Sequence, residues 1–179
     1  MTEAEVSLRL AQFLALSKKA ITPIHVAIDG AQVKMGDKVH FDVAAFMSAS
    51  DWLPECDGER WQATYRNTRS MVPIVVHSRS GVGDVTTTLQ MGRPFVAEAK
   101  KGPLARSKSS AEYPLLREAL GQLLTIEVVP NDSLLAVAVP ASHKFSELAD
   151  RWRKAPLVRQ LGIRILTVAI DGEVNGWKQ

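Results

Sequence analysis

Residues 134–139 form an unbroken apolar run, Leu-Leu-Ala-Val-Ala-Val, and this run is the strongest constraint on the fold. A strand without a polar face must be covered on both sides, as in a sheet that lies between two layers of helices. Helical periodicity precedes the run at 111–127 and follows it at 142–161, and a second buried strand is predicted at 164–170. Because strands joined through a helix run parallel, this half of the chain predicts an α/β architecture.

A β-hairpin is predicted just before this region, with its turn at residues 90–94 and its arms at 84–90 and 94–101. Counting outward from the turn places Asp84 opposite Glu98, and strand alternation places Glu98 and Lys100 on one face. Two carboxylates this close repel each other unless a cation lies between them. The hairpin therefore predicts a site for a hard divalent cation such as magnesium, which favours carboxylates, waters and phosphate oxygens.

The first half of the chain predicts a helix followed by antiparallel strands. Thr2 and Glu5 fit a capping box that opens a helix ending near residue 18. Strands are predicted at 24–28, 38–47 and 72–77, and residues 48–70 are polar and irregular. The whole order is helix, antiparallel meander, helix, strand, helix, strand. This order predicts a single domain over residues 1–179, with a mixed central sheet flanked by helices.

Composition narrows the class of protein further. The 179 residues are 46% hydrophobic, enough to bury one core, and no apolar run approaches the length of a membrane span. A single cysteine, Cys56, excludes an internal disulfide, and the acidic start is unlike a signal peptide. The four histidines lack zinc spacing, and no complete phosphate-binding glycine loop is present. We therefore expect a soluble cytoplasmic protein.

The charge of the chain is unevenly distributed. Residues 1–59 carry five Lys or Arg against nine Asp or Glu, whereas residues 60–179 carry seventeen against ten. The hairpin thus lies in the basic part of a chain whose net charge is +3. A cationic surface around paired carboxylates suits a polyanion such as nucleic acid, although solvation of helix faces explains the same charges.

These features together resemble the PD-(D/E)xK nuclease superfamily, which includes restriction endonucleases and Holliday-junction resolvases. The resemblance rests on Asp84, the Glu98-Ala99-Lys100 run, and the helix and buried strand that follow, and it covers residues 72–140 in detail. Gly83 stands where the motif has proline. The resemblance implies a restriction-endonuclease-like fold and Mg²⁺-dependent hydrolysis of DNA phosphodiester bonds, with Mn²⁺ as a substitute.

The resemblance also implies roles for individual residues. Asp84 and Glu98 would bind the metal, with the backbone carbonyl of Ala99 as a further ligand. Lys100 would orient the attacking water and balance charge near the scissile phosphate. Gln122 occupies a helix on which many relatives place a glutamine near the site. Some relatives add a tyrosine four residues later, but Ile126 stands there, which argues against the exonuclease branch that carries this pair.

Relatives often add a carboxylate from the first helix, so Glu3 and Glu5 are also considered. Glu5 is already explained as the partner of Thr2 in the capping box. We therefore expect the first helix to contribute no carboxylate to the site.

Two segments are candidates for contact with nucleic acid. Residues 100–110 are basic and lead into a helix, and Lys101, Arg106 and Lys108 are the expected phosphate contacts. Arg66 and Arg69 alternate with aromatic residues within 48–70, a candidate inserted recognition segment. A strand with inward aromatic side chains predicts the same letters and is the favoured interpretation of this second segment.

Three functions remain open at this stage. The first is a metal-dependent nuclease, for which cutting both strands of a duplex favours a homodimer. The second is a binding module that keeps the same fold for nucleic-acid contact without cutting. The third is a protein-interaction module in which the hairpin residues form ordinary surface. The sequence does not choose between DNA and RNA, nor between duplex and single strand.

Overall fold

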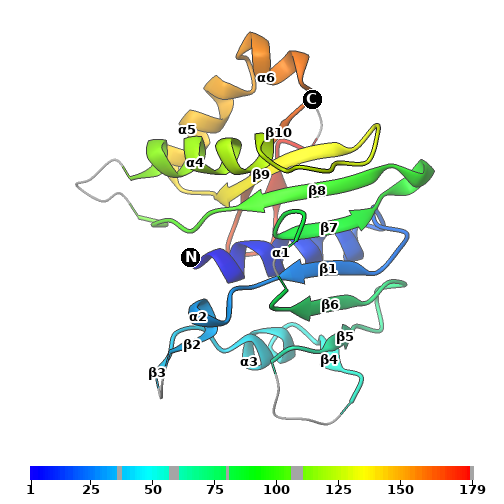
Figure 1. Ribbon diagram of the computed structural model, residues 1–179. Coiled ribbons are helices and arrows are strands. Elements are labelled where there is room, and N and C mark those ends of the chain that lie inside the picture. The colour runs from blue at the N-terminus through cyan, green and yellow to red at the C-terminus, as the bar shows by residue number, and fades with distance from the viewer. Residues whose placement is uncertain (36–37, 57–60, 80, 106–110, 178–179) are drawn as a thin grey trace.

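A computed structural model describes the chain except residues 36–37, 57–60, 80, 106–110 and 178–179 (Figure 1). Its helices are α1 (Glu3–Leu16), α2 (Gly30–Val33), α3 (Val43–Ser48), α4 (Glu112–Leu124), α5 (His143–Trp152) and α6 (Pro156–Gln160), with a 3₁₀ turn at Gln90–Gly92. Its strands are β1 (Ile24–Ala27), β2 (Lys34–Met35), β3 (Lys38–Val39), β4 (Leu53–Pro54), β5 (Thr64–Arg66), β6 (Ile74–His77), β7 (Val85–Thr88), β8 (Pro94–Ala99), β9 (Leu134–Pro140), β10 (Arg164–Val168) and β11 (Val174–Asn175).

Nine of these strands form one mixed sheet within the described residues, in the order β11-β10-β9-β8-β7-β1-β6-β5-β4. Strands β8, β9 and β10 are mutually parallel, as their helical connections predict, and β7 pairs antiparallel with β8. The α/β prediction with a mixed sheet is therefore confirmed. Pro156 is the first residue of α6 and so restarts the helix after α5.

The predicted antiparallel meander is wrong in one respect. Strand β1 lies between β7 and β6, antiparallel to β7 but parallel to β6. Consecutive strands β6 and β7 are therefore not neighbours, and the segment between them crosses the end of β1. Local sequence patterns report strands but not which distant strand inserts between them, and this is why the order was missed.

The strand predicted at 38–47 is wrong beyond its first two residues, because only Lys38–Val39 is a strand and 43–47 belong to the helix α3. Asp42 caps that helix, and its Oδ1 accepts a hydrogen bond of 2.9 Å from the Ala45 amide. Val43 and Met47 are one turn apart and both fully buried, so the apolar pattern follows helical rather than strand spacing.

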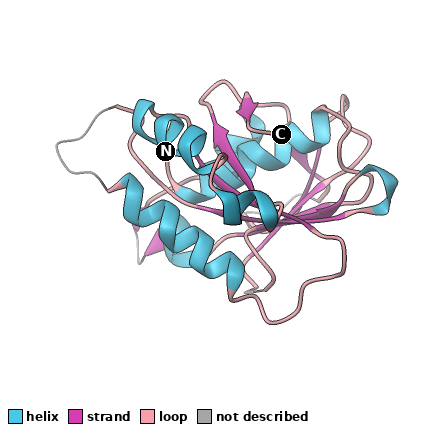
Figure 2. Cartoon of the chain, turned by 90° about the horizontal axis from the view of Figure 1, so that it is seen from above, coloured by secondary structure: helices cyan, strands magenta, loops and turns pink. Residues whose placement is uncertain are grey.

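Helices cover the two faces of the sheet unequally. Helix α1 packs across one face, where Leu10 and Leu14 share a core with Val26 and Ala97. Helices α4 and α5 cover the other face over β8, β9 and β10, in a second core that includes Leu116 and Val137. Figure 2 shows these helix layers on opposite sides of the strands. Strand β9 is thus buried on both faces, as its apolar run predicts.

No described helix lies over the second face of β7, β1 and β6, which is turned toward the viewer in Figure 1. His25 of β1 is exposed on this face, and Thr86 and Thr88 of β7 are half-buried. We call this surface the open face. None of the helices in the described part of the chain is long and apolar enough to cross a membrane.

Candidate active site at the end of the central hairpin

The β7–β8 hairpin has the register that its turn predicts. Val85 pairs with Ala97 and Thr88 with Pro94, so one position further out Asp84 lies opposite Glu98. The Asp84 amide donates a 2.9 Å hydrogen bond to the carbonyl of Ala97. The two carboxyl groups converge and share a side-chain hydrogen bond. The predicted pairing of Asp84 with Glu98 is therefore confirmed as geometry.

Gly83 allows the chain to turn into β7 at this point. Its φ of +81° is a left-handed conformation that residues with a side chain rarely adopt. A Cβ atom at this position would also lie only 2.7 Å from Cγ1 of Val96. Gly83, which stands where the motif has proline, can therefore adopt the backbone angle of this turn, and it leaves the space next to β8 free for Val96.

Asp84 is fixed by backbone groups of both neighbouring strands. Its Oδ2 accepts a 2.7 Å hydrogen bond from the amide of Ala99, and its carbonyl accepts one of 2.9 Å from Ala27. The N–H and C=O of one strand residue point to the same side of the strand. The carbonyl of Ala99 therefore lies on the Asp84 side of β8, where the resemblance implies a third oxygen ligand.

The electrostatic state of this pair is unusual. Burial, more than any other cause, raises the pKa of Asp84 to about 6 and that of Glu98 to about 7. The charge of Asp84 raises the pKa of Glu98 further, and the protonated Glu98 donates the hydrogen bond that they share. Near neutral pH the pair therefore holds a proton, at a position where a bound cation could balance the same negative charge.

Lys100 is buried between the first helix and α4. Its Nζ lies 3.7 Å from Oε2 of Glu3 and 3.2 Å from Oε1 of Glu118. A buried ammonium group is stable only with such partners. Lys100 in turn lowers the pKa values of Asp84 and Glu98, which shows that its charge acts on the pair. The structure thus brings together the three residues of the predicted motif.

Glu3 joins this group, contrary to the expectation that the first helix supplies no carboxylate. Its charge raises the pKa values of both Asp84 and Glu98, and its Oε1 accepts a 3.1 Å hydrogen bond from Gln32. Glu3 lies on the same flank of α1 as the buried Ser7. The spacing of one helical turn places Glu3 and Ser7 on one face of α1, but neither residue type marks that face as buried in the sequence.

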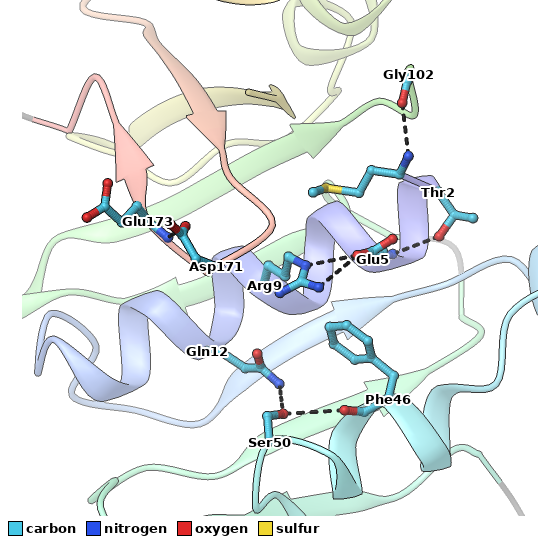
Figure 3. Close-up of polar contacts among 10 residues, drawn as sticks. Thr2, Glu5, Arg9, Gln12, Phe46, Ser50, Gly102, Asp171 and Glu173 are labelled. Atoms are coloured by element: carbon cyan, nitrogen blue, oxygen red, sulfur yellow. Dashed lines mark hydrogen bonds and ion pairs between the residues drawn. The ribbon is translucent and has the colours of Figure 1, made fainter. Parts of the chain in front are cut away.

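The backbone of Glu5 forms the hydrogen bond to Thr2 that the predicted capping box requires. Its amide donates a 3.1 Å hydrogen bond to Oγ1 of Thr2 (Figure 3). Its carboxylate forms an ion pair of 2.9 Å with Arg9, one turn along the helix, also visible in Figure 3. The two glutamates of the first turn thus have different surroundings, and Glu3 is the one beside the paired carboxylates.

Two pockets meet at Glu98. The first, of about 460 Å³, is lined by Glu3, Gln32, Arg79 and Asp84 among others. The second, of about 470 Å³, is lined by Gln122, Thr125 and Val128. Glu98 and Gly81 line both pockets. Gln122 is therefore close to the carboxylate pair, as its place on the helix suggests.

The remaining candidate residues are not gathered at this site. Arg66 pairs with Glu55, and Arg69 lies 3.9 Å from Asp51. Their region of the sheet is four strands from β8, about 19 Å at the usual spacing between strands. Tyr65, which precedes Arg66 in β5, is buried, in agreement with the favoured strand interpretation. Lys101 is exposed just beyond β8, and Arg106 and Lys108 lie outside the described residues.

The donor set was compared with the needs of a divalent cation. Among the described residues, no three His, Cys, Asp or Glu side chains form a group that could hold a metal. Two carboxylates and a backbone carbonyl are hard oxygen donors, and Mg²⁺ is commonly bound by one or two carboxylates with waters and substrate phosphates. The residues present therefore fit Mg²⁺ held partly by substrate and water.

No protein-family model, curated protein or solved structure matches the chain. The geometry and electrostatics of the hairpin site are therefore the basis for assigning a function.

Proposed function

We propose that this chain is a metal-dependent nuclease of the PD-(D/E)xK type that hydrolyses phosphodiester bonds of DNA. The observation that carries the proposal is the pairing of Asp84 with Glu98 at the end of the hairpin, with Lys100 buried beside them. A protein gains nothing in stability by burying two mutually repelling carboxylates. Such an arrangement is typical of a site that binds a cation and an anionic substrate.

Asp84, Glu98 and the carbonyl of Ala99 would hold Mg²⁺, or Mn²⁺ in its place. When bound, the metal lowers the pKa of a coordinated water and offsets negative charge on the phosphate. Lys100 supplies a fixed positive charge for the phosphate, since Glu3 and Glu118 hold its ammonium group in position. Gln122 lines the adjacent pocket, where its amide can orient water or substrate.

The raised pKa values support this assignment. Lys100 only partly offsets the burial and mutual repulsion that favour protonation of the pair, so a bound divalent cation would stabilise the ionised form. Mg²⁺ binding would replace that proton, so metal affinity should increase as the pH rises through 6 to 7. A single copy offers one such pair, so a double-strand cut by this site would require two copies, as in a homodimer.

Cleavage of plasmid and of single-stranded DNA in Mg²⁺, Mn²⁺ or EDTA tests the proposal. The comparison uses Glu98→Gln beside Glu173→Gln, which makes the same chemical change in the turn before β11. We expect divalent-dependent cleavage in the wild type and in Glu173→Gln, and its loss in Glu98→Gln. Cleavage that survives in Glu98→Gln, or no cleavage of either DNA by the wild type, contradicts the proposal.

A further inference from the structure

A third pocket, of about 500 Å³, lies on the open face beside the hairpin site. Its walls include His25 and Thr86 from the sheet, and Val82, Val128 and Pro130 from the segments on either side. None of the twelve described residues that line it carries a carboxylate. The pocket is thus mainly apolar, with one imidazole and a row of threonine hydroxyls, and we call it the side pocket.

The side pocket is continuous with the hairpin site. Val82 and Val128 line both the side pocket and the pocket that contains Glu98 and Gln122. On β8, Val96 borders the side pocket and Glu98 borders the site, two residues further along the same face. Two residues of a strand span about 7 Å, so a group bound in the side pocket would lie about that far from the paired carboxylates.

Part of the apolar wall of this pocket is exposed to solvent. Val128 is 73% exposed and Val82 is 38% exposed. The imidazole of His25 is also exposed, and its ring centroid lies 5.9 Å from that of His77 on the neighbouring strand. Apolar surface in a concave position beside a polar site is typical of ligand binding.

We propose that the side pocket holds an unpaired nucleobase of the strand whose phosphate lies at Asp84 and Glu98; the phosphate's position rests on the proposed function. A base has flat apolar faces and a polar edge. His25 offers a ring for stacking, the two valines offer an apolar wall, and the hydroxyls of Thr86 and Thr88 can meet the edge. A lining without lysine or arginine suits a base better than a phosphate, which needs cationic partners.

The proposal restricts the class of substrate. A base in a duplex is stacked between its neighbours and paired at its edge, so it cannot enter a side pocket unless it leaves the helix. The chain should therefore act on single strands, or on duplex sites where a base is already unpaired. A protein segment with apolar side chains is the other ligand that such a surface could take.

Binding in EDTA tests the pocket without any cleavage. Two fluorescently labelled probes of equal length and charge are compared, a thymidine oligonucleotide and an abasic sugar–phosphate oligomer. Since stacking on a protein contributes on the order of 1–3 kcal/mol per base, we expect the thymidine probe to bind about tenfold more tightly. Equal affinity for the two probes overturns the proposal and points to a protein segment or to no ligand at this pocket.

Variants of exposed residues locate the effect. His25→Ala and Val128→Asp should remove most of the preference for the thymidine probe, whereas His25→Phe should retain it because the ring is kept. Leu157→Asp is the matched control, since Leu157 on α6 is 70% exposed and lies outside all three pockets. A preference that survives in both His25→Ala and Val128→Asp overturns the assignment to this pocket.

Cleavage assays separate this proposal from the nuclease proposal. An oligonucleotide series with one abasic position moved along the strand should show cleavage reduced about tenfold when that position falls beside the cut. Cleavage that is indifferent to the abasic position overturns the side pocket and leaves the nuclease proposal standing. Base-dependent binding without any cleavage supports the side pocket and contradicts the nuclease proposal.

Discussion

The two halves of the central sheet differ in how they are covered, and the candidate site lies at their boundary. Strands β8, β9 and β10 have helices on both faces, whereas β7, β1 and β6 have α1 on one face and the open face on the other. Asp84 and Glu98 lie where β7 meets β8. The covered half supplies the burial that raises their pKa values, and the open half supplies access for a ligand. A site within either half alone would lack one of these conditions.

The largest expected effect follows from neutralising the carboxylate pair. Asp84→Asn and Glu98→Gln should each reduce cleavage by about 10³-fold, the loss typical when a key electrostatic contribution to the transition state is removed. Their melting temperatures in EDTA at pH 8 should stay equal to that of the wild type or increase, because both carboxyls are then ionised and each change removes one of two repelling charges.

Cleavage rates and melting curves on the same preparations check this prediction. Glu173→Gln serves as the control for both measurements. Loss of cleavage accompanied by a large drop in melting temperature would mean that the pair stabilises the fold, and would contradict its interpretation as a ligand site.

The next prediction compares how much one residue on each half of the sheet contributes to the free energy of unfolding. Leu116 is fully buried between α4 and the sheet, so Leu116→Ala should lower the free energy of unfolding by about 2–5 kcal/mol. Thr86 is half-buried on the open face, and Thr86→Ala should change it by about 0.5 kcal/mol or less. Urea denaturation of both variants measures the difference. Similar losses in the two variants would show that the open face is covered in solution.

The parts of the fold that the sequence predicts are those that local chemistry determines. The turn at Gln90–Gly92 sets the register of the hairpin, so Asp84 and Glu98 could be paired by counting. The apolar run of β9 requires cover on both faces, and so it predicts its own burial. Each of these inferences needed only neighbouring residues.

The parts that were missed depend on contacts between distant segments. Glu3 reaches the site because α1 crosses the end of the hairpin, and nothing near residue 3 in the chain encodes that crossing. Strand β1 inserts between β6 and β7 for a similarly non-local reason. The open face was not predicted either, since the alternation in β1 and β7 indicates a polar face but not which helix fails to cover it.

A smaller effect is a loss of stability as the pH rises. Because the pKa values of Asp84 and Glu98 are raised in the folded state to about 6 and about 7, the folded protein binds more protons than the unfolded chain between about pH 4 and pH 7. The free energy of unfolding should therefore decrease across this range, by about 2–3 kcal/mol for one such group. The contribution of this pair to stability is fully present below the unfolded pKa values and is lost as the two carboxyls ionise.

Urea denaturation at a series of pH values, in EDTA, measures this dependence. Asp84→Asn should flatten the curve, because one titrating group is removed and the pKa of Glu98 returns toward its ordinary value. Glu173→Gln, the same kind of change outside the site, is measured beside it as the control. A curve as steep in Asp84→Asn as in the wild type would contradict the raised pKa values.

The smallest expected effect is an increase in stability when Mg²⁺ binds at the boundary between the two halves of the sheet. At a Mg²⁺ concentration ten times the dissociation constant, binding to the folded state alone adds about 1.4 kcal/mol to the free energy of unfolding. For a chain of this size that is an increase in melting temperature of about 3–6 °C. Because Mg²⁺ must displace the proton held by Glu98, the increase should be present at pH 8 and should vanish near pH 5. Glu98→Gln should lose the increase at both pH values and Glu173→Gln should keep the wild-type pattern, so a shift that persists in Glu98→Gln would place the bound metal elsewhere on the molecule.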